Sequence, residues 1–258
     1  MSNSDSILEL VNVSINFGGL QAINRLSFQV ESGQIFALIG PNGAGKTTAI
    51  NMITGIYPPA EGEIYFEGQV LSGKKPYLVT RMGIARTFQN IQVFQNMTVR
   101  ENVMVGLHTR SRSEFVRCLL HTPMMRKEER MIRRRCNEIL EFMGLASKAG
   151  LLAAGLPYGD QKKVEIARTL ATEPRLLLLD EPAAGLNLQE THEMSHTILM
   201  IRETGVTVLL VAHNMDLVMG ISDTITVLNY GEKIADGSPA EIQNSDKVVA
   251  AYLGREPW

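Results

Sequence analysis

The chain has very few cysteines, only Cys118 and Cys136 among its 258 residues. Two thiols are too few for a disulfide framework or a cysteine metal cluster and suit a reducing compartment, so we expect both to be free. Long hydrophobic runs are also missing, because no stretch approaches the roughly 18 apolar residues of a membrane-spanning helix. Residues 1–5 lack the basic start and the apolar stretch of a secretory signal. These absences predict a soluble, unexported chain.

An excess of charge of either sign is lacking as well, since 25 basic and 27 acidic side chains leave a net charge of -2. No chain-wide field therefore draws the protein onto nucleic acid or anionic lipid. One basic segment, residues 110–135, differs, with nine basic and three acidic residues. A nucleic-acid surface and a solvated helical face that meets a partner both stay open for it. The second is favoured, because Phe115 is the only aromatic residue within the segment.

The pattern of apolar residues predicts an α/β fold. Residues 11–17 alternate apolar and polar side chains, as in a strand buried on one face. The glycine-bounded runs 26–30 and 63–67 predict further strands of an antiparallel sheet near the N-terminus. Three other runs are continuously apolar, as in parallel strands covered on both faces: 35–39, 176–179 and 206–211. Capping boxes predict helix starts at Thr98 and Ser238.

The residues after the run 35–39 fit the phosphate-binding pattern GxxxxGK[ST] in the context that this pattern requires. Glycines let backbone N–H groups converge on phosphate oxygens, and the helix that follows points its positive end at them. Lys46 can reach the outer phosphates, and the Thr47 hydroxyl can bind Mg²⁺. The predicted phosphate-binding residues are Gly40, Pro41, Asn42, Gly43, Ala44, Gly45, Lys46, Thr47 and Thr48.

Two acidic residues, Asp180 and Glu181, follow the run 176–179, at the carboxyl end of a strand where open α/β sheets place their ligands. Asp180 can hold Mg²⁺ through water, and Glu181 can polarise an attacking water. A different metal pattern, His192-Glu-Met-Ser-His196, formally fits the two-histidine zinc motif. Because no third ligand is evident, we expect no zinc site there.

The order of these motifs resembles the ATP-binding cassette family of ATPases over residues 8–254. The motifs are the phosphate loop, Gln89 in Thr87-Phe-Gln-Asn90, the signature-like Leu156-Pro-Tyr-Gly159-Asp160-Gln161, Leu179-Asp-Glu-Pro182, Gly185-Leu-Asn187 and His213. The resemblance implies that Phe17 stacks on adenine, that Gln89 senses the γ-phosphate, and that His213 contacts it. It further implies catalytic roles for Glu181, His213 and Lys46, Mg²⁺ ligation by Thr47, Gln89 and Asp180, and nucleotide contact by Gly159.

The same resemblance implies a P-loop NTPase core with a parallel sheet, an antiparallel β lobe and an inserted helical lobe. All of these are expected to form one ATPase domain over residues 1–258. The core and its β lobe are expected over residues 1–95 and 159–258, and the helical lobe over residues 96–158.

Several stretches, among them Phe17-Gly-Gly-Leu20, Arg86-Thr-Phe-Gln89 and Ala251-Tyr-Leu-Gly254, resemble most closely the ATP-binding subunit of branched-chain amino acid importers. This resemblance implies ATP hydrolysis at the cytoplasmic face of the inner membrane. The implied partners are a second ATP-binding subunit in a heterodimer or homodimer, two integral membrane permease subunits and, indirectly, a solute-binding protein; no nucleic acid is expected. A soluble ATPase acting on nucleic acid and a nucleotide-binding module without turnover stay open as other functions.

The signature departs from the family's Leu-Ser-Gly-Gly-Gln, because Pro157 removes the serine hydroxyl that would cap a partner-bound γ-phosphate. A lost charge-assisted hydrogen bond is worth about 1.5–3 kcal/mol. Asp160 adds a negative charge that has to point away from the nucleotide. We therefore expect slow or no hydrolysis at the composite site that uses this signature. The site built on Lys46 and Glu181 depends instead on the partner's signature.

Overall fold

The computed structural model describes residues 6–108 and 123–253. Cys118, residues 110–122 of the basic segment and Gly254 therefore lie outside the described residues, whereas Cys136 is a free, buried thiol. The chain divides into two compact units: the first unit is residues 1–89 and 175–258, and the second unit is residues 90–174. The second unit extends from residue 90 to residue 174, whereas the helical lobe was expected over residues 96–158.

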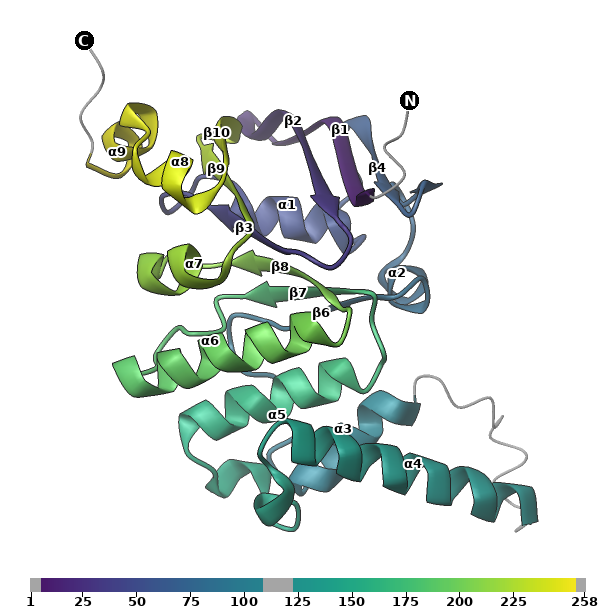
Figure 1. The fold of residues 1–258 in the computed structure, drawn as a ribbon. Coiled ribbons are helices and arrows are strands. Elements are labelled where there is room, and N and C mark those ends of the chain that lie inside the picture. The colour runs from purple at the N-terminus through teal and green to yellow at the C-terminus, as the bar shows by residue number, and fades with distance from the viewer. Residues whose placement is uncertain (1–5, 109–122, 254–258) are drawn as a thin grey trace. The chain divides into compact units, whose positions relative to one another are not determined.

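The first unit contains two sheets (Figure 1). Their strands are β1 (Ser6–Phe17), β2 (Leu20–Glu31), β3 (Ile35–Ile39), β4 (Glu61–Phe66), β5 (Gln69–Val70), β6 (Ile84–Arg86), β7 (Leu176–Asp180), β8 (Thr207–Val211), β9 (Thr224–Asn229) and β10 (Glu232–Gly237). The four-stranded antiparallel sheet has the order β2-β1-β4-β5, and the six-stranded sheet has the order β10-β9-β3-β8-β7-β6. Strands β9, β3, β8, β7 and β6 run parallel, and β10 pairs antiparallel with β9. Both the α/β class and the antiparallel lobe are confirmed.

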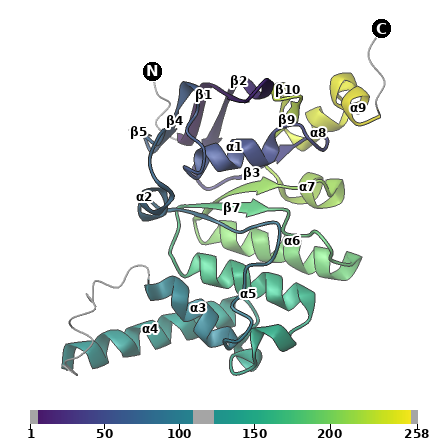
Figure 2. The same ribbon diagram turned by 180° about the vertical axis from the view of Figure 1, so that it is seen from behind.

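Helices cover both faces of the parallel strands in the first unit. They are α1 (Lys46–Ile53), α2 (Pro76–Arg81), α6 (Leu188–Glu203), α7 (Met215–Ile221), α8 (Pro239–Gln243) and α9 (Asp246–Leu253). Helix α1 lies between the two sheets, and its buried Ile50 and Ile53 share one apolar core with residues of both, such as Phe28 and Leu38 (Figure 2). Helix α6 contacts β8, and α8 and α9 contact β10. The continuous burial of β3, β7 and β8 follows from this two-sided cover.

The alternation expected in residues 11–17 holds only in part, because β1 contains a bulge. Its pairing register with β4 shifts between Val11 and Ser14, and Asn12 has a φ of 48°. As a result Val11 and Phe17 are exposed and Ser14 is buried, the opposite of the expected pattern. The strand itself is confirmed, but its predicted inward face is wrong at these three positions.

The second unit is built from helices α3 (Val99–His108), α4 (Pro123–Phe142) and α5 (Tyr158–Leu170). Both predicted capping boxes form: Thr98 and Glu101 exchange hydrogen bonds at the start of α3, as Ser238 and Glu241 do at the start of α8 in the first unit. None of the described helices is long and apolar enough to cross a bilayer.

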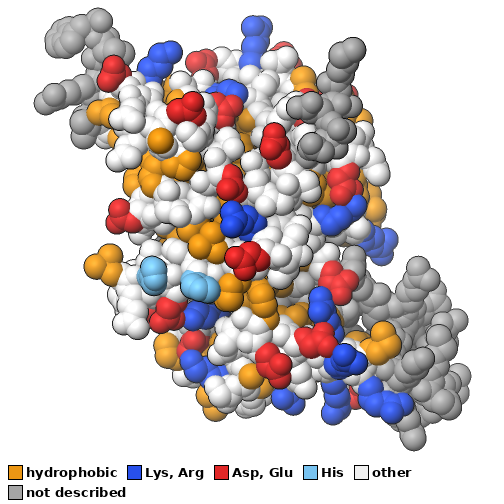
Figure 3. Space-filling view, in the orientation of Figure 1, with side chains coloured by type: hydrophobic (Ala, Val, Ile, Leu, Met, Phe, Trp, Pro, Cys, Tyr) orange, Lys and Arg blue, Asp and Glu red, His pale blue; other side chains and the backbone are white. Residues whose placement is uncertain are grey.

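The described arginines of the basic segment are largely compensated locally. Arg133 pairs with Glu129, and Arg134 and Arg135 both pair with Glu138. These exposed pairs are worth little stability, but they reduce the local field of helix α4. On the face shown in Figure 3, acidic and basic side chains are interspersed among the described residues. Within the described part, α4 therefore fits a solvated helical face better than a nucleic-acid surface.

A close approach of α3 to α5 gives a prediction about stability. A Cβ added to Gly106 would lie 2.1 Å from the carbonyl oxygen of Arg168 and 2.8 Å from Cβ of Ala171, so Gly106→Ala forces the two helices apart. Overpacking of this kind lowers the free energy of unfolding by about 1–3 kcal/mol. The matched substitution Gly220→Ala in α7 meets open space and raises it by up to about 1 kcal/mol. Urea denaturation of the two variants measures both effects, and equal stabilities would contradict this packing.

Candidate nucleotide-binding site

The predicted site residues that follow four strands of the six-stranded sheet gather at one of its edges, because these strands are parallel. The phosphate loop follows β3, His213 follows β8, Asp180 ends β7, and Gln89 follows β6. These strands are neighbours in the order β3-β8-β7-β6, so their carboxyl ends meet at the same edge. Four segments that are far apart in sequence therefore lie together.

The phosphate loop requires glycine where the chain turns into α1. Gly45 has a φ of 102°, and a Cβ there would lie 2.6 Å from Cδ1 of Ile23 and 2.8 Å from the carbonyl oxygen of Ala22. No side chain caps the N-terminus of α1, and its first turn holds no acidic residue. The first backbone N–H groups are therefore left for an external acceptor, and the helix dipole favours an anion there. The loop has the local geometry of a phosphate site.

Lys46 is held at this loop by two backbone carbonyls. Its Nζ donates hydrogen bonds to the oxygens of Gly40 at 2.6 Å and Pro41 at 2.9 Å. Burial lowers the pKa of the Lys46 ammonium, while the carboxylates of Glu181 and Asp180 act in the opposite direction. A buried cation that faces two carboxylates across the sheet edge is a partner for the negative charge of a polyphosphate.

Glu181 is bracketed by two of the other predicted residues. Its Oε2 accepts a hydrogen bond from Gln89 Nε2 at 3.1 Å, and its Oε1 lies 3.4 Å from His213 Nδ1. The backbone of Glu181 has a φ of 51°, and its N–H donates to the carbonyl oxygen of Val211. A left-handed, non-glycine residue is costly, and such strain is concentrated at functional sites. The structure thus brings Glu181, Gln89 and His213 together.

A cavity of about 450 Å³ lies beside these groups in the first unit. The predicted residues that line it are Phe17, Asn42, Gly43, Ala44, Gly45, Lys46, Thr47, Thr48, Gln89 and Glu181. Gly40, Pro41, Asp180 and His213 do not line it; the first two contact Lys46, and His213 contacts Glu181. Asp180 is buried, with 4% of its surface exposed, and directly precedes the cavity residue Glu181.

Phe17 supplies an aromatic surface at the end of β1. Its side chain is 43% exposed, and its ring packs edge to face against Tyr57 with a centroid distance of 5.1 Å. The exposed face is available to a planar ligand such as a nucleotide base. Phe17 therefore contributes to the cavity rather than to the core.

Four cavity residues were not predicted. Leu20, Gln21 and Ala22 come from the start of β2, and Tyr230 comes from the turn between β9 and β10. Tyr230 and Gly231 both have positive φ, as in a two-residue hairpin turn, and Tyr230 is 86% exposed. For Tyr230, the sequence signal was a possible turn at the dipeptide Tyr230-Gly231, and a turn by itself does not indicate a binding site.

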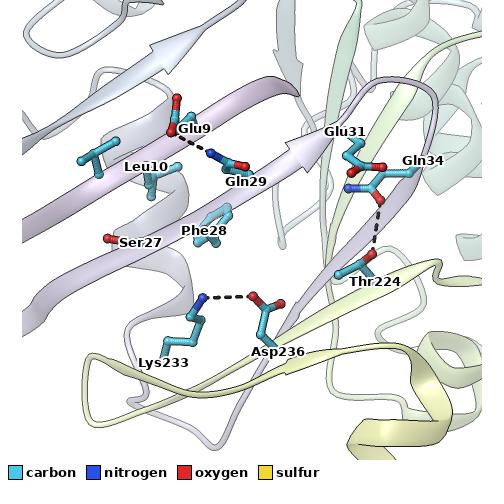
Figure 4. Close-up of a pocket in the computed structure, with 11 residues that line it drawn as sticks. Glu9, Leu10, Ser27, Phe28, Gln29, Glu31, Gln34, Thr224, Lys233 and Asp236 are labelled. Carbon is cyan, nitrogen blue, oxygen red and sulfur yellow. Dashed lines mark hydrogen bonds and ion pairs between the residues drawn. The ribbon is translucent and has the colours of Figure 1, made fainter. Parts of the chain in front are cut away.

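A second cavity of about 450 Å³ lies between β1–β2 and the β9–β10 hairpin (Figure 4). Most of its polar side chains are already paired: Gln29 donates to Glu9, Thr224 donates to Gln34, and Lys233 pairs with Asp236. This hollow shares no residue with the predicted site. We therefore assign the nucleotide to the cavity at the phosphate loop.

The described residues contain no group of three His, Cys, Asp or Glu side chains that could hold a metal. His192 and His196 are exposed on α6, where the zinc motif was considered. For Mg²⁺, the predicted set of a hydroxyl, an amide and a carboxylate consists of the oxygen ligands that this ion prefers. Thr47 and Gln89 line the cavity. Asp180 lies close enough to Lys46 for its carboxylate to oppose the lowering of the pKa of the Lys46 ammonium by burial. These residues fit the ion.

The unusual signature lies in the second unit at the start of α5. Pro157 is the N-cap residue, no side chain caps the helix, and Gly159 is buried in its first turn. The carboxylate of Asp160 forms an ion pair with Lys148. The extra negative charge is therefore compensated within the second unit. Contact of Gly159 with a nucleotide stays a prediction.

Comparison with known proteins shows the family of the chain. A family model described as "ABC transporter" matches residues 23–184, and one described as "Branched-chain amino acid ATP-binding cassette transporter" matches residues 232–257. The chain is 44% identical over 252 residues to the high-affinity branched-chain amino acid transport ATP-binding protein BraF of Pseudomonas aeruginosa, covering 97% of this chain and 99% of the relative. It is 43% identical to LivG of Escherichia coli, with the same coverage.

Two solved structures share the fold. A nucleotide-free ATP-binding cassette from an ABC transporter matches with a TM-score of 0.83 at 35% identity, covering 96% of this chain and 98% of that one. A cassette in its ADP conformation matches with a TM-score of 0.84 at 34% identity, covering 96% and 99%. The chain therefore belongs to the ATP-binding cassette transporter family, in the branch of the branched-chain amino acid transport ATP-binding proteins.

Proposed function

We propose that this chain is the ATP-hydrolysing subunit of an importer of branched-chain amino acids. The observation that carries the proposal is the cavity in which the phosphate loop with Lys46 faces Glu181. The cavity residues suit a nucleotide and do not indicate which solute is transported. The choice of branched-chain amino acids rests on the names of the relatives. The chain couples ATP hydrolysis to transport that separate membrane subunits carry out.

The chemistry follows from where each side chain is held. Loop N–H groups and Lys46 neutralise charge on the phosphates, which is the main requirement of phosphoryl transfer to water. Glu181 is placed to orient and polarise the attacking water, and His213 and Gln89 each hold one of its oxygens. Phe17 holds the base at the other end of the cavity.

Mg²⁺ would be held by Thr47, Gln89 and, through water, Asp180. When bound, the ion neutralises charge on the outer phosphate oxygens. Gln89 also reaches Glu181, so this one residue connects the metal ligands to the residue that orients water. Metal binding and water activation would therefore both depend on the same short segment after β6.

A partner subunit is needed to complete each site, because the signature of one chain acts on the nucleotide of another. We infer a second ATP-binding subunit, in a heterodimer or homodimer, and two integral membrane permease subunits that receive a solute from a solute-binding protein. The complex places this chain at the cytoplasmic face of the membrane. Since Asp160 is neutralised by Lys148, the missing hydroxyl at Pro157 remains the main weakness of this signature.

Replacement of the loop lysine tests nucleotide binding. Lys46→Ala removes a charge-assisted hydrogen bond worth about 1.5–3 kcal/mol, which weakens ATP binding by about 10- to 150-fold. The matched variant Lys75→Ala changes an exposed lysine at the start of α2 and leaves the affinity unchanged. Isothermal titration of the purified chain with ATP and Mg²⁺ measures both. Equal ATP affinities in the two variants would contradict binding of the nucleotide at the phosphate loop.

Replacement of the catalytic glutamate tests the inequality of the two composite sites. In a reconstituted heterodimeric transporter, Glu181→Gln in this chain lowers phosphate release by about 10²- to 10⁴-fold, because water loses its general base. The equivalent glutamate substitution in the partner changes the total rate by less than about twofold. Glu203→Gln, an exposed control at the end of α6, has no effect. Equal losses from substitutions in either subunit would show that the altered signature supports hydrolysis.

A further inference from the structure

The last residue of β6, Arg86, forms a buried bridge to which the proposed function gives no role. Its Nη2 donates to Asp180 Oδ2 at 2.8 Å, and its Nη1 donates to Asn51 Oδ1 at 2.6 Å. The side chains of Arg86 and Asp180 are only 8% and 5% exposed. One guanidinium thus joins the end of β7 to α1, the helix that begins at Lys46.

The geometry of this bridge leaves half of the Asp180 carboxylate available. Arg86 donates to Oδ2, and Oδ1 accepts no hydrogen bond from a side chain of the described residues. Arg86 Nε is buried without a hydrogen-bond partner, so the guanidinium forms this bridge at the cost of one unsatisfied donor. The planar guanidinium directs its two Nη donors to two different acceptors, whereas a lysine ammonium has no such rigid fork.

The bridge has a counterpart three residues later. Arg86, the last residue of β6, donates to Asp180, and Gln89, three residues after it, donates to Glu181. The ring of Phe88 lies 5.0 Å from the Arg86 guanidinium and covers it. The segment 86–89 therefore contacts both the acid expected to bind Mg²⁺ and the acid expected to orient water.

We propose that Arg86 is a positioning residue that fixes the Asp180 carboxylate in the orientation needed for Mg²⁺ and ties it to the phosphate-loop helix through Asn51. The proposal rests on the proposed function, since it concerns the same Mg²⁺ and nucleotide. Arg86 does not line the cavity. Its effect passes through Asp180, so it changes the Mg²⁺ dependence of nucleotide binding rather than the affinity for nucleotide without metal.

The test compares ATP binding to the full chain with and without Mg²⁺. Arg86→Lys keeps the charge but cannot bridge both partners, and loss of a residue that orients a metal ligand weakens metal affinity by about 10- to 100-fold. We expect the Mg²⁺ concentration at half-maximal enhancement of ATP binding to rise by at least about tenfold, with affinity in EDTA within about twofold of the unsubstituted chain. Calorimetric titration at a series of Mg²⁺ concentrations measures both.

Two further variants keep the outcome interpretable. Asn51→Ala removes only one side of the bridge, and its Mg²⁺ requirement shifts in the same direction by a smaller factor; it decides the question if Arg86→Lys does not fold. Arg81→Lys in α2, an exposed arginine over the ring of Tyr77, is the matched control and shifts nothing.

An unchanged Mg²⁺ requirement in Arg86→Lys and Asn51→Ala would overturn the proposal, and so would an equal loss of ATP affinity with and without Mg²⁺. An equal loss with and without Mg²⁺ would mean that Arg86 stabilises the phosphate loop and has no separate effect on Mg²⁺ binding. Failure of the unsubstituted chain to bind ATP in the presence of Mg²⁺ would instead refute the proposed function, and the role of Arg86 with it. The two failures are therefore separable.

Discussion

The site depends on the parallel alignment of the central strands of one sheet. Because β3, β8, β7 and β6 run in the same direction, the segments that follow them meet at a single edge. One segment presents backbone N–H groups and Lys46, and another presents Asp180 and Glu181. Opposite charges are thus held close together by the fold, before any ligand is present. A polyphosphate and a divalent cation together satisfy both sets of charges.

Much of this arrangement could be predicted from sequence because the motifs are local. The bounds of β3 were predicted as found, since a fully buried parallel strand is a continuous apolar run. The glycines and Lys46 of the phosphate loop follow it directly, so their proximity needs no tertiary information. The antiparallel sheet and both capping boxes were also predicted, because glycine boundaries and capping residues act within a few positions.

Features that depend on distant residues could not be predicted. The inward face predicted for β1 was wrong at Val11, Ser14 and Phe17, because register shifts interrupt the alternation along this strand. Strand β6 has three residues, too few to show a period. The bridge of Arg86 joins Asn51 and Asp180, which lie 35 and 94 positions away in sequence. Tyr230 enters the cavity only through a hairpin turn whose two strands were not predicted.

The central claim is that a nucleotide's phosphates bind where β3 passes into α1. Deuterium exchange of the backbone amides measures this directly, because N–H groups that donate to phosphate oxygens exchange slowly. With ATP and Mg²⁺ added to the purified chain, the account predicts slower exchange over residues 43–48, beyond any change elsewhere in the chain. Unchanged exchange at this loop, with protection confined to other segments, would contradict it.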